Sequence, residues 1–292
     1  MIAYNPKDWF TFIFKLHKAD TFRALFLMLI CIGIYTGIIT WFELEYFHLA
    51  KDSNVKNLNI LHNMLGFVLS LLLVFRTNTA YDRWWEGRKL WGSLVNNSRN
   101  LAIKLNILLE SDDTSNRSLF KKIIPAFAVV LRNHLLKETI RLELDEIDHP
   151  ELGAIDKDKH VPNLVAAIIA KKVNKLYIQK KITDAQLINL NAELSSFTDI
   201  CGACERIKNT PIPFSYSLFV KKFIFFYIMT LPFSFAMQVG YYAIPVVIFI
   251  FYVLASLEMI AEEIEDPFGI DLNDLPTQKI ADNIKKHIGE IL

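Results

Sequence analysis

Residues 57–91 read NLNILHNMLGFVLSLLLVF and then RTNTAYDRWWEGRKLW, with the two halves directly joined. The first half is apolar, and the second is dense in aromatic and charged side chains. No Gly–Pro pair, serine cluster or other helix breaker separates them. The pattern predicts one long helix that leaves a membrane and continues into water. A helix that only anchors a protein has no need of this continuity, whereas a helix that lines a conduit does.

Two other apolar blocks are long enough to cross a bilayer, for which about 20 apolar residues are needed. Residues 24–42 carry no charge, and neither do residues 223–257. The second block is too long for one crossing, and Gly240 lies near its middle. We expect two spans there, about 218–239 and 241–258, joined by a very short turn. With the apolar half of the opening stretch, the sequence predicts four transmembrane helices.

Basic residues flank these spans on one side. They precede the first span, follow the second and precede the third, whereas the connection at 43–56 holds only Lys51 and Lys56. The positive-inside rule then places both termini and the middle segment in the cytoplasm of a multi-pass protein, which we expect in the cell inner (plasma) membrane. The flanking residues are Lys7, Lys15, Lys18, Arg23, Arg76, Arg83, Arg88, Lys89, Lys221 and Lys222.

The fold class predicted is an all-α membrane protein with a helical cytosolic domain. We divide the chain into 1–75 with the first two spans, 76–217 as the cytosolic domain, 218–258 with the last two spans, and 259–292 as a cytosolic tail.

Apolar residues recur at helical spacing through three stretches of the cytosolic domain, at 123–135, 164–173 and 187–197. Thr183 with Gln186 predicts a capping box. Residues 143–163 are polar and predict a surface loop, and a short amphipathic helix is expected at about 277–290.

Composition agrees with this mixed organisation. Hydrophobic residues make up 52% of the chain, yet 22% of residues are charged, which is too many for a chain wholly inside a bilayer. The formal net charge is +1, and no basic patch interleaved with aromatic residues is present, so we expect no nucleic-acid partner.

The residues give little sign of an active site. Cys201 and Cys204 form a C-x-x-C without a second pair or a histidine at zinc-finger spacing, and we interpret them as packing residues rather than a redox or zinc site. None of the seven histidines lies in a metal or nucleophile motif, and we expect no enzyme activity. His62, at the outer end of the second span, could face a vestibule or sit among headgroups.

Three stretches carry a family resemblance: FRTNTAYDRWWEGRKLWG at 75–92, ERIKNTPIPFSY at 205–216 and EDPFGIDLNDLP at 265–276. In this order around four spans, they resemble the bacterial branch of the bestrophin family. The resemblance implies a homopentamer around one axial pore, with the second transmembrane helix lining a narrow neck. Members are ion channels, and animal members pass chloride under calcium control. The implied partners are further copies of the chain, the lipid bilayer and small inorganic ions.

The same resemblance assigns the neck to Ile60, Met64 and Val68, which the spacing of four places on one stripe of a helix. Five such stripes would form apolar rings that can gate by dewetting. Without the resemblance, packing of the stripe against a neighbouring helix is the usual role. Arg76, just below the neck, would attract anions locally. A second constriction is expected near residues 182–190.

In calcium-gated relatives, acids that follow a PFG triplet bind calcium. Here PFG is 267–269, and only Asp271 and Asp274 of the acidic run are present. The sequence leaves open a calcium site at these two residues or a solvated acidic tail. We expect no other cofactor.

The sequence also leaves the function open beyond the fold. Chloride conduction follows family precedent, and a cation-selective (sodium or potassium) channel of the same fold is the alternative. A membrane-anchored scaffold or signalling protein and a secondary transporter are further rivals. The transporter is disfavoured because no inverted repeat and no ionisable residue deep in a span is seen.

Overall fold

The computed structural model describes residues 21–48, 58–137 and 159–292, and these ranges are all-helical without a strand. Most of the loop predicted at 143–163 lies outside the described residues, as do the basic residues before residue 21 and at 51 and 56. The elements are α2 (Thr21–Trp41), the π-helical turn η1 (Phe42–Tyr46), α3 (Leu58–Leu108), α4 (Thr114–Leu136), α6 (Val161–Ile178), α7 (Asp184–Asn209), α8 (Phe214–Val239), the 3-10 turn η3 (Gly240–Tyr242), α9 (Ala243–Glu265) and α10 (Thr277–Ile291).

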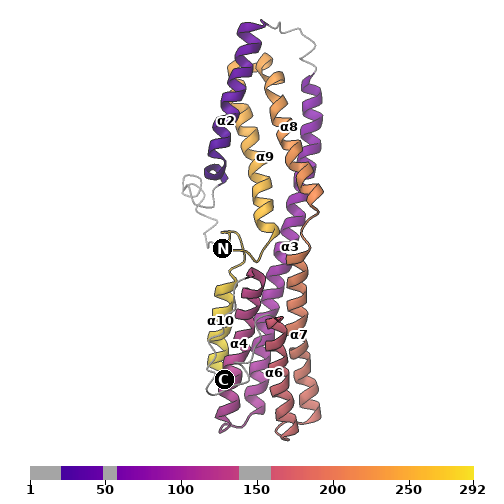
Figure 1. Cartoon of the computed structure of the whole chain (residues 1–292), viewed down its shortest axis with the longest axis vertical. Coiled ribbons are helices and arrows are strands. Elements are labelled where there is room, and N and C mark those ends of the chain that lie inside the picture. Colours follow the sequence, from indigo (N-terminus) through magenta and orange to yellow (C-terminus); the bar gives the residue numbers. More distant parts are fainter. Residues whose placement is uncertain (1–20, 49–57, 138–158) are drawn as a thin grey trace.

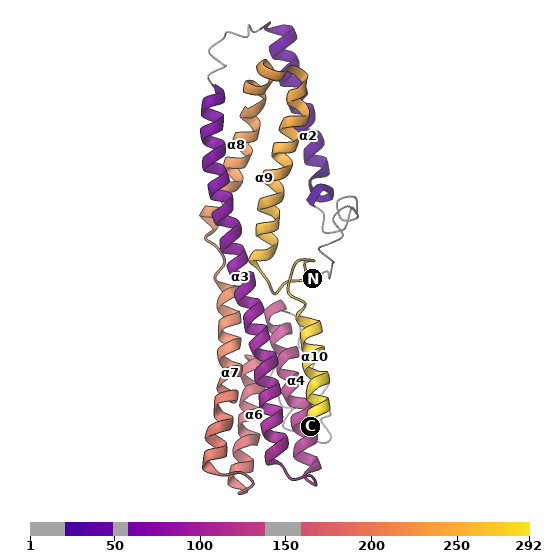
Figure 2. The same ribbon diagram turned by 180° about the vertical axis from the view of Figure 1, so that it is seen from behind.

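Helix α3 is continuous over 51 residues, which confirms the prediction made from its sequence. At a rise of about 1.5 Å per residue it is about 76 Å long. It runs through nearly the full height of the molecule, as Figures 1 and 2 show. Because no proline interrupts residues 58–108, every backbone N–H beyond the first turn can bond within the helix.

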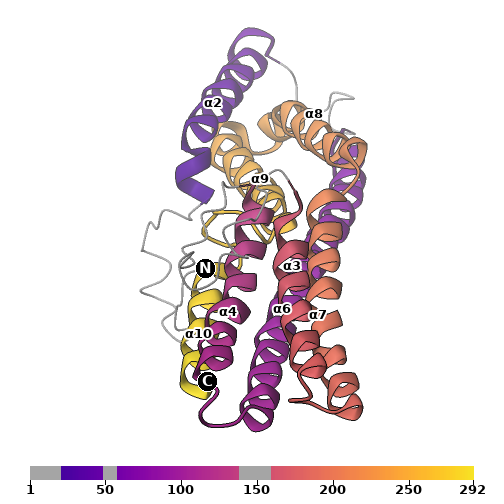
Figure 3. The same cartoon turned by 60° about the horizontal axis from the view of Figure 1, so that its bottom comes forward.

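The helices form two bundles that share α3. In the upper bundle of Figure 1, α8 and α9 pack against the first half of α3, and α2 packs against α8 and α9. In the lower bundle, α4, α7 and α10 pack against the second half of α3, and α6 packs against α4 and α7. Figure 3 shows the lower bundle obliquely, with its lower end turned toward the viewer. The core of the upper bundle is Leu69, Leu73, Val220, Ile224, Ile228, Leu231 and Val247. The core of the lower bundle is larger and includes Trp91, Phe120, Phe127 and Phe197.

Three stretches are long and apolar enough to cross a membrane: Thr21–Tyr46, Leu58–Leu108 and Phe214–Glu265. The third is interrupted at Gly240, whose φ of +59° lies in the left-handed region that glycine adopts without strain. There the chain turns through η3, and α9 returns beside α8 (Figure 1). The turn expected in the middle of the long apolar block is therefore present at Gly240.

In the lower bundle the chain alternates in direction, so three helix ends meet near the upper bundle. Helix α3 descends, α4 ascends, α6 descends and α7 ascends (Figure 1). Because of these directions, the end of α4, the start of α6 and the end of α7 lie close together.

The predicted capping box is confirmed at the start of α7. The Thr183 side chain accepts from Gln186 N–H, and the Gln186 side chain accepts from Thr183 N–H.

Cys201 and Cys204 are both buried in the core of the lower bundle, on α7. Burial, with the nearby charge of Glu205, raises the pKa of the Cys201 thiol to about 12. Both cysteines are free. This environment favours the interpretation of the C-x-x-C as a packing pair, because a buried, protonated thiol is a poor nucleophile and metal ligand.

Two glycines provide a matched test of this packing. A Cβ at Gly87 of α3 would lie 3.1 Å from the Phe268 ring and from Pro267, whereas a Cβ at Gly202 of α7 would meet nothing within 4 Å. Alanine raises helix propensity by about 1 kcal/mol over glycine. We expect Gly202→Ala to raise the thermal unfolding midpoint of the purified protein. Gly87→Ala should leave the midpoint unchanged or lower it, and an equal rise for both variants would contradict the packing at Gly87.

Candidate functional site

The stripe predicted to form a neck is left exposed by the part of its own chain that the structure describes. The exposed fractions of Ile60 and Met64 are both 65%, and that of Val68 is 46%. These residues lie on the side of α3 away from the buried Leu69 and Leu73. Among the described residues, no helix of the same chain packs over the stripe, so these side chains are free to face other copies or a central space.

The side chain of His62 faces α8 and is not exposed. It is buried, its Nδ1 lies 2.9 Å from the Leu58 carbonyl oxygen, and its Nε2 lies 3.0 Å from the Thr230 hydroxyl of α8. Its ring also packs near Tyr227. The vestibule and headgroup roles considered for His62 do not match this position, in which it joins α3 to α8.

Arg76 has a different environment from the one the sequence suggested. Its side chain is 1% exposed, and its Nη2 donates to Glu265 Oε2 at 2.7 Å. Its Nε lies 3.5 Å from Glu258 Oε1. The guanidinium of Arg76 is thus paired with two carboxylates of its own chain and joins α3 to α9. That Arg76 attracts anions locally stays a prediction.

Glu265 and Arg83 extend this contact to four segments. Glu265 Oε1 accepts the Ile212 N–H at 2.7 Å, just before α8 begins. Arg83 donates to the carbonyl oxygens of Glu265 at 3.0 Å, Thr210 at 2.6 Å and Ile207 at 2.6 Å. We call this region, from Arg76 to Arg83 of α3 with the ends of α7 and α9 and the start of α8, the junction. It satisfies carbonyl groups that helix ends leave without intrahelical partners.

Sequence reasoning missed the acidic half of the junction. Glu258 and Glu265 lie seven residues apart, which places them on one face of α9 two turns apart. That spacing was the available signal, because an acidic pair facing a bilayer boundary needs a cationic partner. Glu86 is a further example, because its Oε1 lies 2.6 Å from Arg206 Nη2 of α7.

Asp274, one of the two tail carboxylates, is buried. Its Oδ2 accepts the Asp271 N–H at 2.6 Å, and its Oδ1 is buried without a hydrogen-bond partner. Burial, reinforced by the charges of Asp271, Asp266 and Glu263, raises the pKa of Asp274 from 3.8 to about 7. Asp271 is exposed.

The acidic tail offers few ligands to a cation. Within 21–48, 58–137 and 159–292, the one group of three or more potential ligand atoms within 4.8 Å of one another lies elsewhere. The tail therefore offers one buried, unpaired carboxylate oxygen and does not gather three carboxylates.

Ile188 stands out in the stretch where a second constriction was expected. Its exposed fraction is 71%, whereas Ile182 and Leu190 are buried in the core. Ile188 lies on α7, in the lower bundle. Ile107 of α3 and Ile178 of α6, in the same bundle, are similarly exposed, at 77% and 70%. Ile188 is thus one of several isoleucines that the described part of the chain leaves exposed, and the one that lies within 182–190.

Comparison with known proteins gives concordant matches. The family model described as "Bacterial/Fungal Bestrophin protein" matches residues 1–290. A protein of Nostoc sp. named as a voltage-dependent anion channel-forming protein is 34% identical over 290 residues, covering 98% of this chain and 92% of that protein. A protein of the same name from Escherichia coli K12 is 29% identical, with the same coverage. The crystal structure of a bacterial bestrophin homologue from Klebsiella pneumoniae has a TM-score of 0.78 at 25% identity, covering 91% of this chain and 98% of that one.

Removing the guanidinium of Arg76 should destabilise the chain strongly. Arg76→Gln leaves two carboxylates buried without their cation, for which roughly 3–5 kcal/mol is typical. We expect a large fall in the unfolding midpoint, partly recovered by adding Glu258→Gln. Arg88→Gln, at an exposed position of the same helix, is the control and should change little. Similar midpoints for both single variants would show that the buried pair is unimportant.

Asp274 should make stability depend on pH. Below pH 3.8 the stabilisation from this carboxyl is fully present. Between pH 3.8 and about 7 the folded state holds a proton that the unfolded state lacks, so stability falls as the pH rises, and the stabilisation is lost once the pH passes about 7. We expect Asp274→Asn to narrow the difference between unfolding midpoints measured at about pH 5 and about pH 8. Asp282→Asn, on the exposed side of α10, should leave that difference as it is. An unchanged difference in Asp274→Asn would contradict this assignment.

Proposed function

This chain belongs to the bestrophin family, in its bacterial and fungal branch, and on that basis we propose that five copies form an ion channel around one axial pore. The chain is a membrane channel protein and not an enzyme, in keeping with relatives named as channel-forming proteins. Passive movement of small ions along the axis is the proposed activity. The inner (plasma) membrane is the proposed location.

The observation that carries this proposal is the uncovered stripe on an unbroken helix. The side chains of Ile60, Met64 and Val68 lie outside the core of their own chain. Helix α3 continues below them for the length of the lower bundle. Around a five-fold axis the three residues form three stacked rings of hydrocarbon. A narrow apolar bore strips water from an ion and offers nothing in return, so the rings act as a dewetting gate.

We propose a four-span topology for each copy, with α2, the first half of α3, α8 and α9 each crossing once. The turn at Gly240 supports two crossings in the third apolar stretch. Four basic residues lie near the ends of the spans that are closest to the lower bundle: Arg83, Arg88, Lys221 and Lys222. By the positive-inside rule, they support a cytoplasmic lower bundle and cytoplasmic termini.

Ile188 is our candidate for a second constriction. Its exposed side chain on α7 is available to form, with its four copies, an apolar ring of five-fold symmetry in the cytosolic part of the bore. The position agrees with the stretch in which the sequence predicts this feature. Ions would then cross two apolar regions in series, one within the membrane and one in the cytosol.

Anion conduction, with chloride by family precedent, is the proposed selectivity, because the relatives are named as anion channel-forming proteins. A neck of plain hydrocarbon discriminates charge weakly, and Arg76 is compensated by Glu258 and Glu265. The cation-selective channel is thus the second candidate. Reversal potentials of purified protein in planar bilayers under a salt gradient distinguish the two by sign.

Asp271 and Asp274 are the proposed position for a calcium ion, and the buried, unpaired Oδ1 of Asp274 supports this. A ligand that binds only the folded state raises its stability. We expect calcium to raise the unfolding midpoint of the wild type at about pH 8, where Asp274 is ionised, and to have no effect on Asp274→Asn. An equal effect on both proteins would place calcium elsewhere.

The neck assignment is tested by conductance. We expect alanine at Ile60, Met64 and Val68 together to widen the bore and raise single-channel current. Leu27→Ala, which shortens an exposed apolar side chain of α2, is the matched control and should leave the current unchanged. Unchanged current in the triple variant would show that other residues form the neck.

Two measurements decide between the channel and its rivals. A five-fold particle imaged in detergent or lipid nanodiscs supports the channel, whereas a monomer or dimer would favour a membrane-anchored scaffold or signalling protein. Single-channel current steps support passive conduction. Flux that saturates and is coupled to a second solute would favour a transporter.

A further inference from the structure

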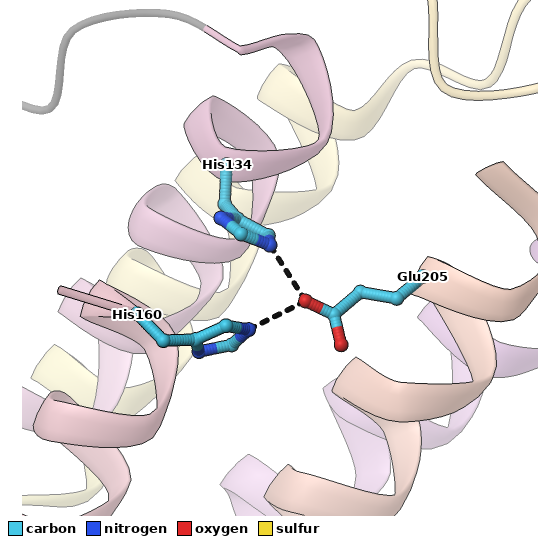
Figure 4. Close-up of side chains that lie close together, drawn as sticks. All are labelled: His134, His160 and Glu205. Carbon is cyan, nitrogen blue, oxygen red and sulfur yellow. Dashed lines mark hydrogen bonds and ion pairs between the residues drawn. The ribbon is translucent and has the colours of Figure 1, made fainter. Parts of the chain in front are cut away.

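Three potential metal ligands converge in the lower bundle, outside the pore features and the acidic tail. Figure 4 shows His134 of α4, His160 at the start of α6 and Glu205 of α7 with their polar ends together. Both imidazole Nε2 atoms contact the same carboxylate oxygen, Glu205 Oε1, at 2.6 Å from His134 and 2.5 Å from His160. Among the residues that the structure describes, this is the one such group.

The topology brings these side chains together. The end of α4, the start of α6 and the end of α7 meet at the end of the lower bundle nearest the junction (Figure 1). The three residues come from three separate helices, so no short motif announces them. Their side chains are 27–35% exposed, which leaves the group accessible to a dissolved ion.

The donor set has a clear chemical preference. Two neutral imidazole nitrogens and one carboxylate oxygen suit Zn²⁺ and similar divalent transition metals, which bind such ligands at about 2.0–2.2 Å. Three protein ligands leave a fourth tetrahedral position for water. We propose that His134, His160 and Glu205 form a binding site for a zinc-class divalent cation.

The site needs only a small opening to accept such an ion. Tetrahedral ligands at about 2.0 Å from a metal stand about 3.3 Å from each other, less than 1 Å beyond the present nitrogen–oxygen distances. In the absence of metal, the two rings hold Glu205 by hydrogen bonds. Partial burial alone would raise the pKa of Glu205, but the hydrogen bonds from His160 and His134 lower it, so the carboxylate is ionised and available as a ligand.

Metal binding must displace one weak contact. His160 Nδ1 accepts the Asn163 N–H at 3.3 Å and thereby caps α6. A metal on Nε2 moves the ring proton to Nδ1, so this long hydrogen bond is lost. One metal–nitrogen bond replaces it, and the ion then links α4, α6 and α7 directly.

Cys201, one turn before Glu205, is the alternative ligand on the same face of α7. Its side chain is in the core, and burial raises the pKa of its thiol to about 12. A thiolate ligand would therefore need the core to open. We assign the site to the two histidines and the glutamate alone.

The test uses the full-length, assembled protein in detergent with any affinity tag removed. Isothermal titration with Zn²⁺ should give one ion per chain, and Co²⁺ should give the strong visible bands of a tetrahedral site without a thiolate-to-cobalt charge-transfer band. The double variant His134→Ala/His160→Ala should lose the binding. His287→Ala, which changes a histidine of α10 in the same bundle, is the control and should keep it.

Glu205→Gln tests whether misfolding explains a loss of Zn²⁺ binding in the double variant. It should keep the fold, because its amide oxygen can still accept a hydrogen bond from an imidazole. Zn²⁺ should raise the unfolding midpoint of the wild type and of His287→Ala but not that of Glu205→Gln. Undiminished binding in the double variant, or no binding by the wild type, would overturn the proposal, and a charge-transfer band would assign the metal to the cysteines. None of these readouts depends on conductance, so they are independent of the proposed channel function.

Discussion

Arg76 and Arg83 lie two turns apart on one face of α3, and between them they bind the segments that enter and leave the membrane bundle. Arg76 is enclosed by Glu258 and Glu265 of α9, and Arg83 donates to three carbonyl oxygens at the ends of α7 and α9. Helix ends carry carbonyl groups without partners, and burying them unpaired is costly. The guanidinium, with five donors in a planar fork, can satisfy several at once. This contact lets one helix belong to two bundles without a gap between them.

Because of the same contact, the proposed neck is lined by hydrocarbon side chains and not by an unpaired charge. An unpaired cation near the neck would give a direct reason for anion preference, but the guanidinium of Arg76 is paired with Glu258 and Glu265 of its own chain. The side of α3 away from the core is left with Ile60, Met64 and Val68. Apolar rings control whether water and ions pass, while they choose weakly between ions of opposite sign. Gating and selectivity therefore have different structural origins in the proposed channel.

The histidine–glutamate group lies at the same end of the lower bundle as the junction. Glu205 is followed directly by Arg206, which pairs with Glu86 of α3, so an ion held by Glu205 would act on a helix turn already tied to α3. The two features differ in accessibility. The side chain of Arg76 in the junction is buried, whereas the three ligands are partly exposed. A bound metal would thus reinforce the contact between α4, α6 and α7 close to the point where the lower bundle meets the upper bundle.

The sequence by itself determined three features of the helices. The absence of a breaker between residues 57 and 91 made α3 continuous, Thr183 with Gln186 placed the start of α7, and Gly240 placed the turn between α8 and α9. These features depend on contacts within a few residues, which a local pattern records. Only the tertiary structure decided the partners of the charged groups. Arg76 finds Glu265 across 189 residues, and His134 finds Glu205 across 71. Such pairs depend on which helix faces come together, and that follows from the packing of the whole chain rather than from local spacing.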